Sequence, residues 1–211
     1  MRQLRENKPT ADVLMTSMRA MGYSFESAIA DIIDNSISAN AKNVQLYFPI
    51  DPADCYVAVC DDGDGMNPLE LFDAMKYGSE QKRNGRSESD LGRFGLGLKA
   101  ASLSQCRKLT VASKKNGIVS AYTWDLDVIE EKKDWFVIEC SEEEIKSIRF
   151  ISWLDKLESG TVVVWEDFDF IEKASGSVYA ELNKYQESTS EYLSLIFHRF
   201  LNRPLQSRIN I

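Results

Sequence analysis

Three short segments hold the polar residues best suited to bind a charged ligand. They are Asp31-Ile-Ile-Asp-Asn35, Asp61-Asp-Gly-Asp-Gly65 and Gly92-Arg-Phe-Gly-Leu-Gly-Leu-Lys99. The first offers a carboxylate and a carboxamide one helical turn apart. The second is an acidic turn with two glycines, and the third is a glycine-rich stretch that leads into a helix. Each segment alone is a weak signal, so their order and spacing along the chain carry the argument.

Asp31 and Asn35 share one stripe of a predicted helix whose other positions are mostly apolar. Magnesium takes few protein ligands and prefers hard oxygens, so the amide oxygen of Asn35 suits it. A carboxylate one turn earlier can orient or deprotonate a water molecule near a bound phosphate. The alternative interpretation of the pair is a solvated polar face of the helix.

Asp61 ends a strand of the buried type, and a carboxylate there can accept a hydrogen bond from an exocyclic amine such as that of adenine. Gly63 and Gly65 permit positive φ angles and a close approach of the backbone to a flat base. An ordinary acidic turn is the alternative. A calcium loop is disfavoured, because its ligand spacing and closing Glu are missing.

Gly92, Gly95 and Gly97 precede a predicted helix, and unobstructed backbone amides at a helix N-terminus bind phosphate. Neither standard phosphate fingerprint fits, since there is no Gly-x₄-Gly-Lys-Ser/Thr and the glycines follow a loop instead of a strand. Residues 76–99 carry a net charge of +3, whereas the rest of the chain carries −11. This local basic patch favours an anionic ligand, with a solvated loop as the alternative.

Composition narrows the class of protein. The 211 residues are 44% hydrophobic, which suits one globular domain, and the net charge of −8 argues against a surface built mainly for nucleic acid. The four cysteines form no Cys-x-x-Cys, so we expect reduced thiols and a cytoplasmic location. The only histidine, His198, follows Ile196 and Phe197 in an apolar stretch and is expected to pack, which argues against a histidine-based metal site or a Ser-His-Asp triad. The chain opens without a signal peptide, and no apolar run approaches membrane-spanning length.

The hydrophobic pattern predicts an α/β (α+β) two-layer sandwich, with a mixed, mostly antiparallel sheet and helices on one face. Predicted helices span residues 10–21, 25–39, 68–76, 95–106, 141–147 and 177–201. Predicted strands span residues 43–50, 55–60, 108–113, 118–124, 135–140 and 161–165. Residues 77–94 form a long polar loop, which is typical of a functional lid.

Together these segments resemble the GHKL superfamily: gyrase B subunits, ninety-kilodalton heat-shock chaperones, histidine kinases and MutL-type repair proteins. That family carries an acid and an Asn on one helix, an Asp-x-Gly-x-Gly box, a second glycine box beneath a lid, and a late Gly-Thr pair. All four occur here in order, ending with Gly160-Thr161, over about residues 20–170. The phrasing is most similar to the MutL, MORC and chaperone branches, and the resemblance implies a Bergerat ATP-binding fold.

The resemblance implies ATP and Mg²⁺ as cofactors and gives each matching residue a role. At the reacting end, Asp31 is expected to be the general base and Asn35 the Mg²⁺ ligand. The base pocket and phosphate positions are then Asp61 as adenine anchor, Gly63, Gly65 and Met66 along the base, Thr161 assisting Asp61, and the amides of Gly92, Gly95 and Gly97 on phosphate. Lys99 either faces phosphate or is structural, and Lys82 or Arg83 in the lid is a candidate phosphate contact.

Three departures from the family pattern bear on activity. Asp31 stands where the gyrase, MutL and chaperone branches usually have Glu, so the base sits about 1 Å or more from its usual place, and a displacement of that size can cost roughly a hundredfold in rate. Ser38 stands where many relatives carry an acid. The chain also ends at Ile211, where gyrase and MutL relatives continue into a second domain.

We therefore expect an N-terminal arm and helix (residues 1–20), an ATP-binding domain (21–175), and a C-terminal helix with the start of a missing transducer-type domain (176–211). The expected function is an ATP-binding, Mg-dependent, slowly hydrolysing switch whose lid closure is coupled to partner docking or homodimerisation. The alternative is a regulatory ATP-binding module with negligible hydrolysis. Nucleic-acid binding by this chain alone is not supported by its charge, and no membrane partner is expected.

Overall fold

The structure is a computed structural model that describes residue 5 and residues 8–20, 22–77, 97–201 and 209–211. The helices in these ranges are α1 (Ala11–Arg19), α2 (Phe25–Ser38), α3 (Pro68–Met75), α4 (Gly97–Gln105), α5 (Leu126–Lys132), α6 (Glu142–Ser147), α7 (Ile151–Leu154), α8 (Asp169–Ser175), α9 (Val178–Ile196) and α10 (His198–Leu201). The strands are β1 (Val44–Tyr47), β2 (Val57–Asp61), β3 (Lys108–Lys115), β4 (Ile118–Asp125), β5 (Ile138–Glu139) and β6 (Gly160–Glu166).

The six strands form one sheet in the order β1-β2-β6-β3-β4-β5, and each pair of neighbours is antiparallel. Just before β1, Asn43 adds a parallel bridge to Asn210. The register places β2, β6 and β3 side by side, so that Asp61 faces Thr161 and Thr161 faces Ser113. Residues far apart in sequence therefore form one row across the sheet, on a single face.

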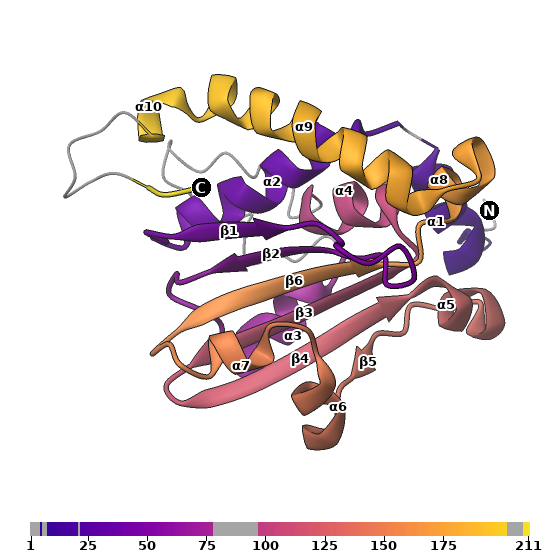
Figure 1. Ribbon diagram of the computed structural model, residues 1–211. Helices are drawn as coiled ribbons and strands as arrows, with labels where there is room; N and C mark the ends of the chain where they lie inside the picture. Colours follow the sequence, from indigo (N-terminus) through magenta and orange to yellow (C-terminus); the bar gives the residue numbers. More distant parts are fainter. Residues whose placement is uncertain (1–4, 6–7, 21, 78–96, 202–208) are drawn as a thin grey trace.

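The larger core lies between one face of the sheet and helices α2, α4 and α9, with α9 outermost (Figure 1). Helix α2 buries Ile29 and Ile33 completely, at the spacing that places side chains on one helical face. Its first residue, Phe25, stacks on Tyr185 of α9 with ring centroids 4.5 Å apart, and meets Trp165 of β6 edge-on at 5.6 Å. These rings tie α2 both to the sheet and to the outer helix.

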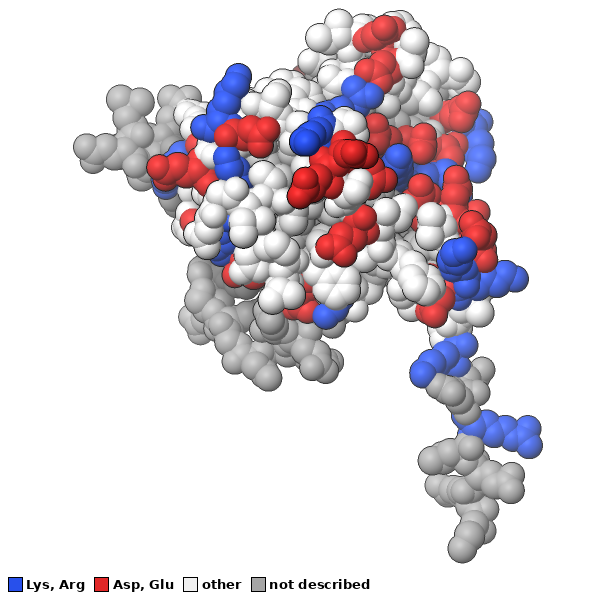
Figure 2. All heavy atoms as spheres, turned by 90° about the horizontal axis from the view of Figure 1, so that it is seen from below, with Lys and Arg blue, Asp and Glu red and all other residues white. Residues whose placement is uncertain are grey.

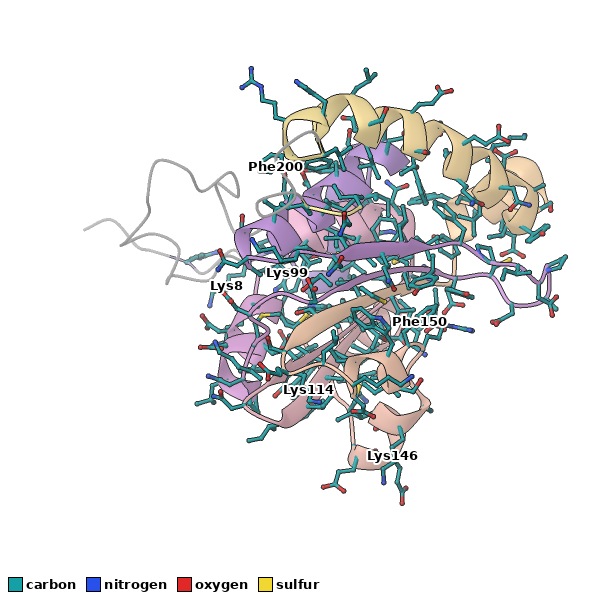
Figure 3. All side chains as sticks on the ribbon, turned by 60° about the vertical axis from the view of Figure 1, so that its left-hand side comes forward. Lys8, Lys99, Lys114, Lys146, Phe150 and Phe200 are labelled. Carbon is teal, nitrogen blue, oxygen red and sulfur yellow. The ribbon has the colours of Figure 1, made fainter. Side chains whose placement is uncertain are left out.

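A smaller core covers the opposite face of the sheet, where α6 and α7 pack. Its sheet residues are small or β-branched: Ala58, Cys60, Ala112, Ala121, Val162 and Val164. Leu154 of α7 is fully buried against them. Phe150, labelled in Figure 3, stacks on Tyr47 with centroids 4.1 Å apart and closes the edge of this core.

Helix α4 is held at its C-terminal end by α1 and α8. The Nε atom of Arg19 donates to the carbonyl oxygen of Leu103 at 2.7 Å. The same guanidinium forms a largely buried ion pair with Asp169, whose pKa is lowered below its usual value by Arg19 in spite of burial. Because breaking a buried ion pair leaves a buried charge without a partner, Arg19 holds α1, α8 and the C-terminal part of α4 together.

An aromatic group lies where α3 leads into residue 77. The ring of Tyr77 meets Trp124 edge-on at 5.5 Å and lies 5.2 Å from Trp135, measured between centroids. The indole N–H of Trp124 donates to the carbonyl oxygen of Met75 at 3.0 Å. Burial raises the pKa of the Tyr77 hydroxyl far above its usual value, so Tyr77 stays neutral in this environment.

The predicted two-layer fold is confirmed: all six predicted strands occur, and the long helices cover one face of the sheet. Helix boundaries differ at several places. The expected helix over 177–201 divides at Phe197 into α9 and α10, and α5, α7 and α8 were not predicted. The two short helices α6 and α7 also cover part of the second face.

Acidic and basic side chains are interspersed on the face seen from below in Figure 1. Figure 2 shows that acidic side chains gather near its centre, with Lys and Arg scattered around them. Among the described residues, no helix has the length and apolar character needed to cross a membrane.

Candidate functional site

Asp61, the last residue of β2, is the most buried carboxylate among the predicted site residues, with 5% of its surface exposed. The hydroxyl of Ser36 on α2 donates to its Oδ2 at 2.8 Å, and the amide of Gly63 donates to its Oδ1 at 3.0 Å. Burial raises the pKa of Asp61, and the hydrogen bonds from Gly63 and Ser36 partly offset that rise. The result is a fixed carboxylate at the end of a strand, able to accept a further hydrogen bond.

The turn after Asp61 depends on glycine for two different reasons. At Gly63 an added Cβ would lie 2.7 Å from the carbonyl oxygen of Ala39. At Gly65 φ is +62°, and an added Cβ would lie only 2.0 Å from the carbonyl oxygen of Lys114 on β3. Both positions therefore bring the turn against neighbouring backbone at a distance that no side chain permits. The predicted close approach of this turn to a flat base is a different contact and stays a prediction.

Thr161 and Ser113 continue the row that starts at Asp61, and all three are buried. The two hydroxyl oxygens lie 3.0 Å apart. Ser113 Oγ also accepts from the amide of Met66 at 2.8 Å and donates to the carbonyl oxygen of Gly160 at 3.0 Å. Ser113 thus joins the glycine turn to the late Gly-Thr pair, a link that the sequence did not reveal.

Asp31 and Asn35 lie half-buried on α2. The Nδ2 atom of Asn35 donates to the carbonyl oxygen of Asp31 at 2.8 Å. This contact fixes the amide so that its hard oxygen, Oδ1, is the atom left to accept a ligand, which fits a magnesium site. Burial raises the pKa of the Asp31 carboxyl, which makes it a better base once ionised.

Asp34 is a second half-buried carboxylate on the same helix. Its pKa is raised first by burial and then by the nearby charge of Asp31. The charge of Asp31 thus favours the protonated form of Asp34. Asp34 lies within the same five-residue segment as Asp31 and Asn35 but was not among the predicted site residues.

Lys99 on α4 is buried, and its ammonium is held by the C-terminal end of α3 (Figure 3). Its Nζ donates to the carbonyl oxygens of Ala74 and Lys76, both at 2.6 Å, and lies 5.9 Å from the centroid of the Tyr77 ring. A cation at the C-terminal end of a helix is stabilising. These contacts agree with the structural one of its two predicted roles, while a contact with phosphate stays a prediction.

Other predicted site residues lie in the glycine-rich segment. Gly97 is the first residue of α4. Gly92, Gly95, Lys82 and Arg83 lie outside the described residues, as does the predicted lid apart from Tyr77. Their proposed contacts with phosphate therefore stay predictions.

Two residues missed by sequence analysis complete the described site, namely Ser36 and Ser113. Ser36 follows Asn35 directly, so one helix holds the predicted magnesium ligand and also fixes the predicted adenine anchor. The signal available in the sequence was its place on the apolar stripe of the predicted helix, which in the structure is the buried side of α2. Ser113 ends a predicted strand and could be recognised only from the register with Thr161.

A hollow of about 600 Å³ lies on another part of the surface, and none of the predicted site residues lines it. Its lining includes Asp54, Lys108 and Arg149. Arg149 is already paired with Asp54 and Glu166, so its charge is largely compensated. The buried carboxylate and the convergent hydrogen bonds, not the size of a hollow, identify the candidate site.

Comparison with known proteins agrees with the arrangement of these residues. A sequence profile described as histidine kinase-, DNA gyrase B-, and HSP90-like ATPase matches residues 23–161. That range includes α2, the turn after Asp61, the glycine-rich segment and Thr161. It covers well over half of the chain.

Individual relatives match shorter segments. ATPase morc-1 of Caenorhabditis elegans is 33% identical over 95 residues, covering 45% of this chain and 11% of that protein. ATPase MORC2B of Mus musculus is 28% identical over 114 residues, covering 53% and 11%. Protein MICRORCHIDIA 5 of Arabidopsis thaliana is 26% identical over 162 residues, covering 67% and 22%.

The matched segments thus span less than a quarter of the length of these relatives. The similarity to the MORC proteins agrees with the branch expected from sequence. Taken with the profile match and the folded positions of Asp31, Asn35, Asp61 and Thr161, it places this chain in the family of histidine kinase-, DNA gyrase B- and HSP90-like ATPases.

Proposed function

We propose that this chain is a Mg-ATP-binding module that hydrolyses ATP slowly and acts as a conformational switch. The observation that carries the proposal is the buried carboxylate of Asp61, held by Ser36 and Gly63 beside Thr161. A fixed acceptor at the end of a strand, next to a glycine turn that lets a flat base approach, suits an exocyclic amine such as that of adenine. The family membership of the chain supports the same ligand.

Each site residue has a proposed part in binding. Asp61 accepts from the amine of adenine, with Thr161 assisting, and the backbone of the turn lies along the base. The residues proposed to lie along the base are Gly63, Gly65 and Met66. Those proposed to contact the phosphates are Gly92, Gly95 and Gly97. Backbone amides at the start of α4 favour negative charge.

Asn35 is the proposed protein ligand of Mg²⁺. Its Nδ2 is occupied by the carbonyl oxygen of Asp31, so Oδ1 is the atom oriented for the cation. When bound, Mg²⁺ neutralises charge on the phosphate oxygens. Lys99 is less suited to neutralising phosphate charge, because the carbonyl oxygens of Ala74 and Lys76 already accept hydrogen bonds from its ammonium.

Asp31 is the proposed general base. It would accept a proton from the attacking water and hold that water in line with the terminal phosphate. Burial raises the pKa of its carboxyl toward the range useful for a base. The side chain is one methylene shorter than Glu, which supports slow turnover.

The proposed switch couples nucleotide binding to the rest of the molecule. Closure of the predicted lid, residues 77–94, over the nucleotide would bury it and create a surface that docks a partner or a second copy of this chain. The relatives named as MORC ATPases support ATP hydrolysis as the energy source. The four cysteine thiols are free, which supports the cytoplasm as the location.

Calorimetric titration with Mg-AMPPNP tests the binding part of the proposal. We expect the wild-type chain to bind and Asp61→Asn to bind about a hundredfold more weakly, because a charge-assisted hydrogen bond is lost. Asn keeps the shape of the side chain, so a melting curve should show both proteins folded. Absence of binding by the folded wild type would contradict the proposal.

A turnover assay tests the enzyme part and separates it from the alternative of a regulatory module with negligible hydrolysis. We expect Asp31→Asn to abolish hydrolysis without loss of AMPPNP binding, and Asp31→Glu to raise the rate up to about a hundredfold by restoring reach. Asp34→Asn, which changes a neighbouring half-buried carboxylate, is the matched control. Equal background rates for wild type, Asp31→Asn and Asp31→Glu would favour the regulatory module.

The switch itself is measurable as a change in mass. Light scattering after size exclusion, with and without Mg-AMPPNP, should show a nucleotide-dependent dimer if a second copy is the partner. A chain that stays monomeric while binding AMPPNP tightly would leave docking of a different protein as the proposed output.

A further inference from the structure

The hydroxyl of Ser113 has three hydrogen-bond partners but only one hydrogen to donate. The amide of Met66 can only donate, and the carbonyl oxygen of Gly160 can only accept. The third partner, the hydroxyl of Thr161, is able to do either. Ser113 therefore accepts from Met66, gives its hydrogen to Gly160, and has one lone pair left for Thr161.

This count fixes the direction of the third hydrogen bond. Only one distribution of hydrogens uses all three contacts, and in it the hydroxyl of Thr161 donates to Ser113 Oγ over 3.0 Å. Thr161 then has no hydrogen left to donate and offers only lone pairs to a ligand. A buried hydroxyl held in this way does not rotate freely, since any other direction leaves a polar group unpaired.

Asp61 carries the same polarity one strand away. Its two carboxylate oxygens accept from Ser36 and Gly63, and an ionised carboxylate has no hydrogen to offer. The single hydrogen of the Ser36 hydroxyl points to Asp61 at 2.8 Å, with the carbonyl oxygen of Ile32 as a second, longer acceptor at 3.3 Å, so Ser36 has no hydrogen left for a ligand. Asp61 and Thr161 are register partners on adjacent strands, so both present acceptors on the same face.

We propose that Ser113 is a specificity-determining positioning residue, which sets the hydroxyl of Thr161 as an acceptor and so selects a purine with an amine at position 6 over one with a carbonyl there. The inference rests on the proposed function of the same site. A carbonyl oxygen opposite two acceptors finds no donor and leaves buried polar groups unpaired. Ser113 acts through Thr161 and does not itself contact the base.

The test compares binding of Mg-AMPPNP and of its inosine counterpart, which has a carbonyl oxygen in place of the amine. Wild type should prefer AMPPNP strongly. In Ser113→Ala the hydroxyl of Thr161 is released and can donate to the carbonyl, so we expect the ratio of the two affinities to fall about tenfold, the size of one net hydrogen bond.

Ser120→Ala is the matched control. Ser120 lies opposite Ser113 on β4, and its hydroxyl is buried without a hydrogen-bond partner among the described residues. Removing it deletes the same atom from the next position of the same row, so the affinity ratio should stay at the wild-type value. Melting curves of the ligand-free variants show whether each is folded.

A double-mutant cycle distinguishes positioning from a general structural role. Thr161→Val removes the hydroxyl and should itself lower the ratio, and adding Ser113→Ala to it should then change the ratio no further. If Ser113→Ala does not fold, Ser113→Cys takes its place, because a thiol is a weaker acceptor of nearly the same shape.

The outcomes separate the two proposals. A folded wild type that binds neither nucleotide overturns the proposed function, and this inference with it. Wild type that prefers AMPPNP, with an unchanged ratio in Ser113→Ala and in Ser113→Cys, overturns the inference alone. Equal losses of both affinities in Ser113→Ala would likewise mean that Ser113 only supports the fold.

Discussion

Two neighbouring rows of residues across β2, β6 and β3 point to opposite faces of the sheet and differ sharply in polarity. Asp61, Thr161 and Ser113 form a polar row on one face. Their immediate neighbours Cys60, Val162 and Ala112 form the corresponding row on the other face, and that row is entirely apolar. The alternation of side chains along each strand thus places a hydrogen-bond network directly behind a small hydrophobic core.

Energetically the two rows work in different ways. The apolar row gains stability from burial, and its members need only the right volume. The polar row gains little net stability, but each group has a defined donor or acceptor, so a single change leaves a partner unpaired. The apolar row therefore depends on volume, whereas the polar row depends on matched donors and acceptors, so substitutions in the two rows should have different effects.

The largest effect is expected at Gly65, in the turn that follows Asp61. Gly65→Ala introduces a side chain at φ +62°, and the backbone conformation alone costs about 1–2 kcal/mol. Its Cβ would lie 2.0 Å from the Lys114 carbonyl oxygen, so the turn must also move. We expect measurable AMPPNP binding to be lost in calorimetry, together with a lower melting temperature.

Gly117→Ala provides the control for this change. Gly117 has φ +77° in the turn between β3 and β4, but an added Cβ there meets nothing within 4 Å. It should therefore show the backbone cost and keep nucleotide binding. Equal binding by the two variants would mean that the close approach at Gly65 has no part in the site.

Leu154→Ala should destabilise the smaller hydrophobic core on the second face of the sheet. Leu154 is fully buried against the second core, so truncation should lower the free energy of unfolding by about 2–5 kcal/mol. Urea denaturation measures the loss. Below the unfolding transition, the preference for AMPPNP over its inosine counterpart should be unchanged, and a changed preference would show that the two faces are not independent.

Ala112→Ser transfers the chemistry of one face to the other. Ala112 is fully buried beside Val162 and Ala121, so a hydroxyl there has no partner and should cost about 1–3 kcal/mol. The adjacent Ser113 carries the same hydroxyl with three partners. Urea denaturation that shows no loss for Ala112→Ser would argue against apolar surroundings at position 112.

The smallest effect is a pH dependence at Asp61. In the folded protein the pKa of its carboxyl is raised above the ordinary value of 3.8, mainly by burial, so ionisation opposes folding. The stability that this group adds is present below pH 3.8 and is lost as pH rises through the folded pKa. Asp61→Asn should therefore melt at the same or a higher temperature than ligand-free wild type near neutral pH.

Melting curves from pH 7 down to about 4 check the sign, because the advantage of the Asn variant should shrink as Asp61 becomes protonated. The comparison with Asn isolates Asp61 from Asp31 and Asp34, whose pKa values are raised too. An advantage that grows on acidification would contradict the buried-charge account.

Much of the fold followed from local pattern. Alternating or continuous apolar runs indicated all six strands, and an apolar stripe over residues 25–39 indicated α2, which Ser24 caps by accepting from the amide of Ser27. The helices that were missed have weak local signals. Helix α7 spans four residues and starts after Phe150 in a left-handed conformation, without a side-chain cap. Helix α5 follows β4 directly, with Asp125 both ending the strand and capping the helix.

The candidate site was predictable in part for the same reason. Asp31, Asn35 and Asp61 belong to short motifs that sequence alone displays. The role of Ser113 depends on β6 lying between β2 and β3, and that pairing joins residues about fifty positions apart. Local spacing carries no information on such a register, because it is set by packing of the whole sheet.

The aromatic group around Tyr77 gives the chain a built-in optical reporter. Tyr77 contacts Trp124 and Trp135, and the ammonium of Lys99 lies over the same ring. Tyr77 precedes the glycine-rich segment in the sequence, and Lys99 is its last residue, within α4. The emission of the two indoles depends on the charge and packing beside them, so rearrangement of that segment would be visible in unlabelled protein, and its rate could be followed by rapid mixing.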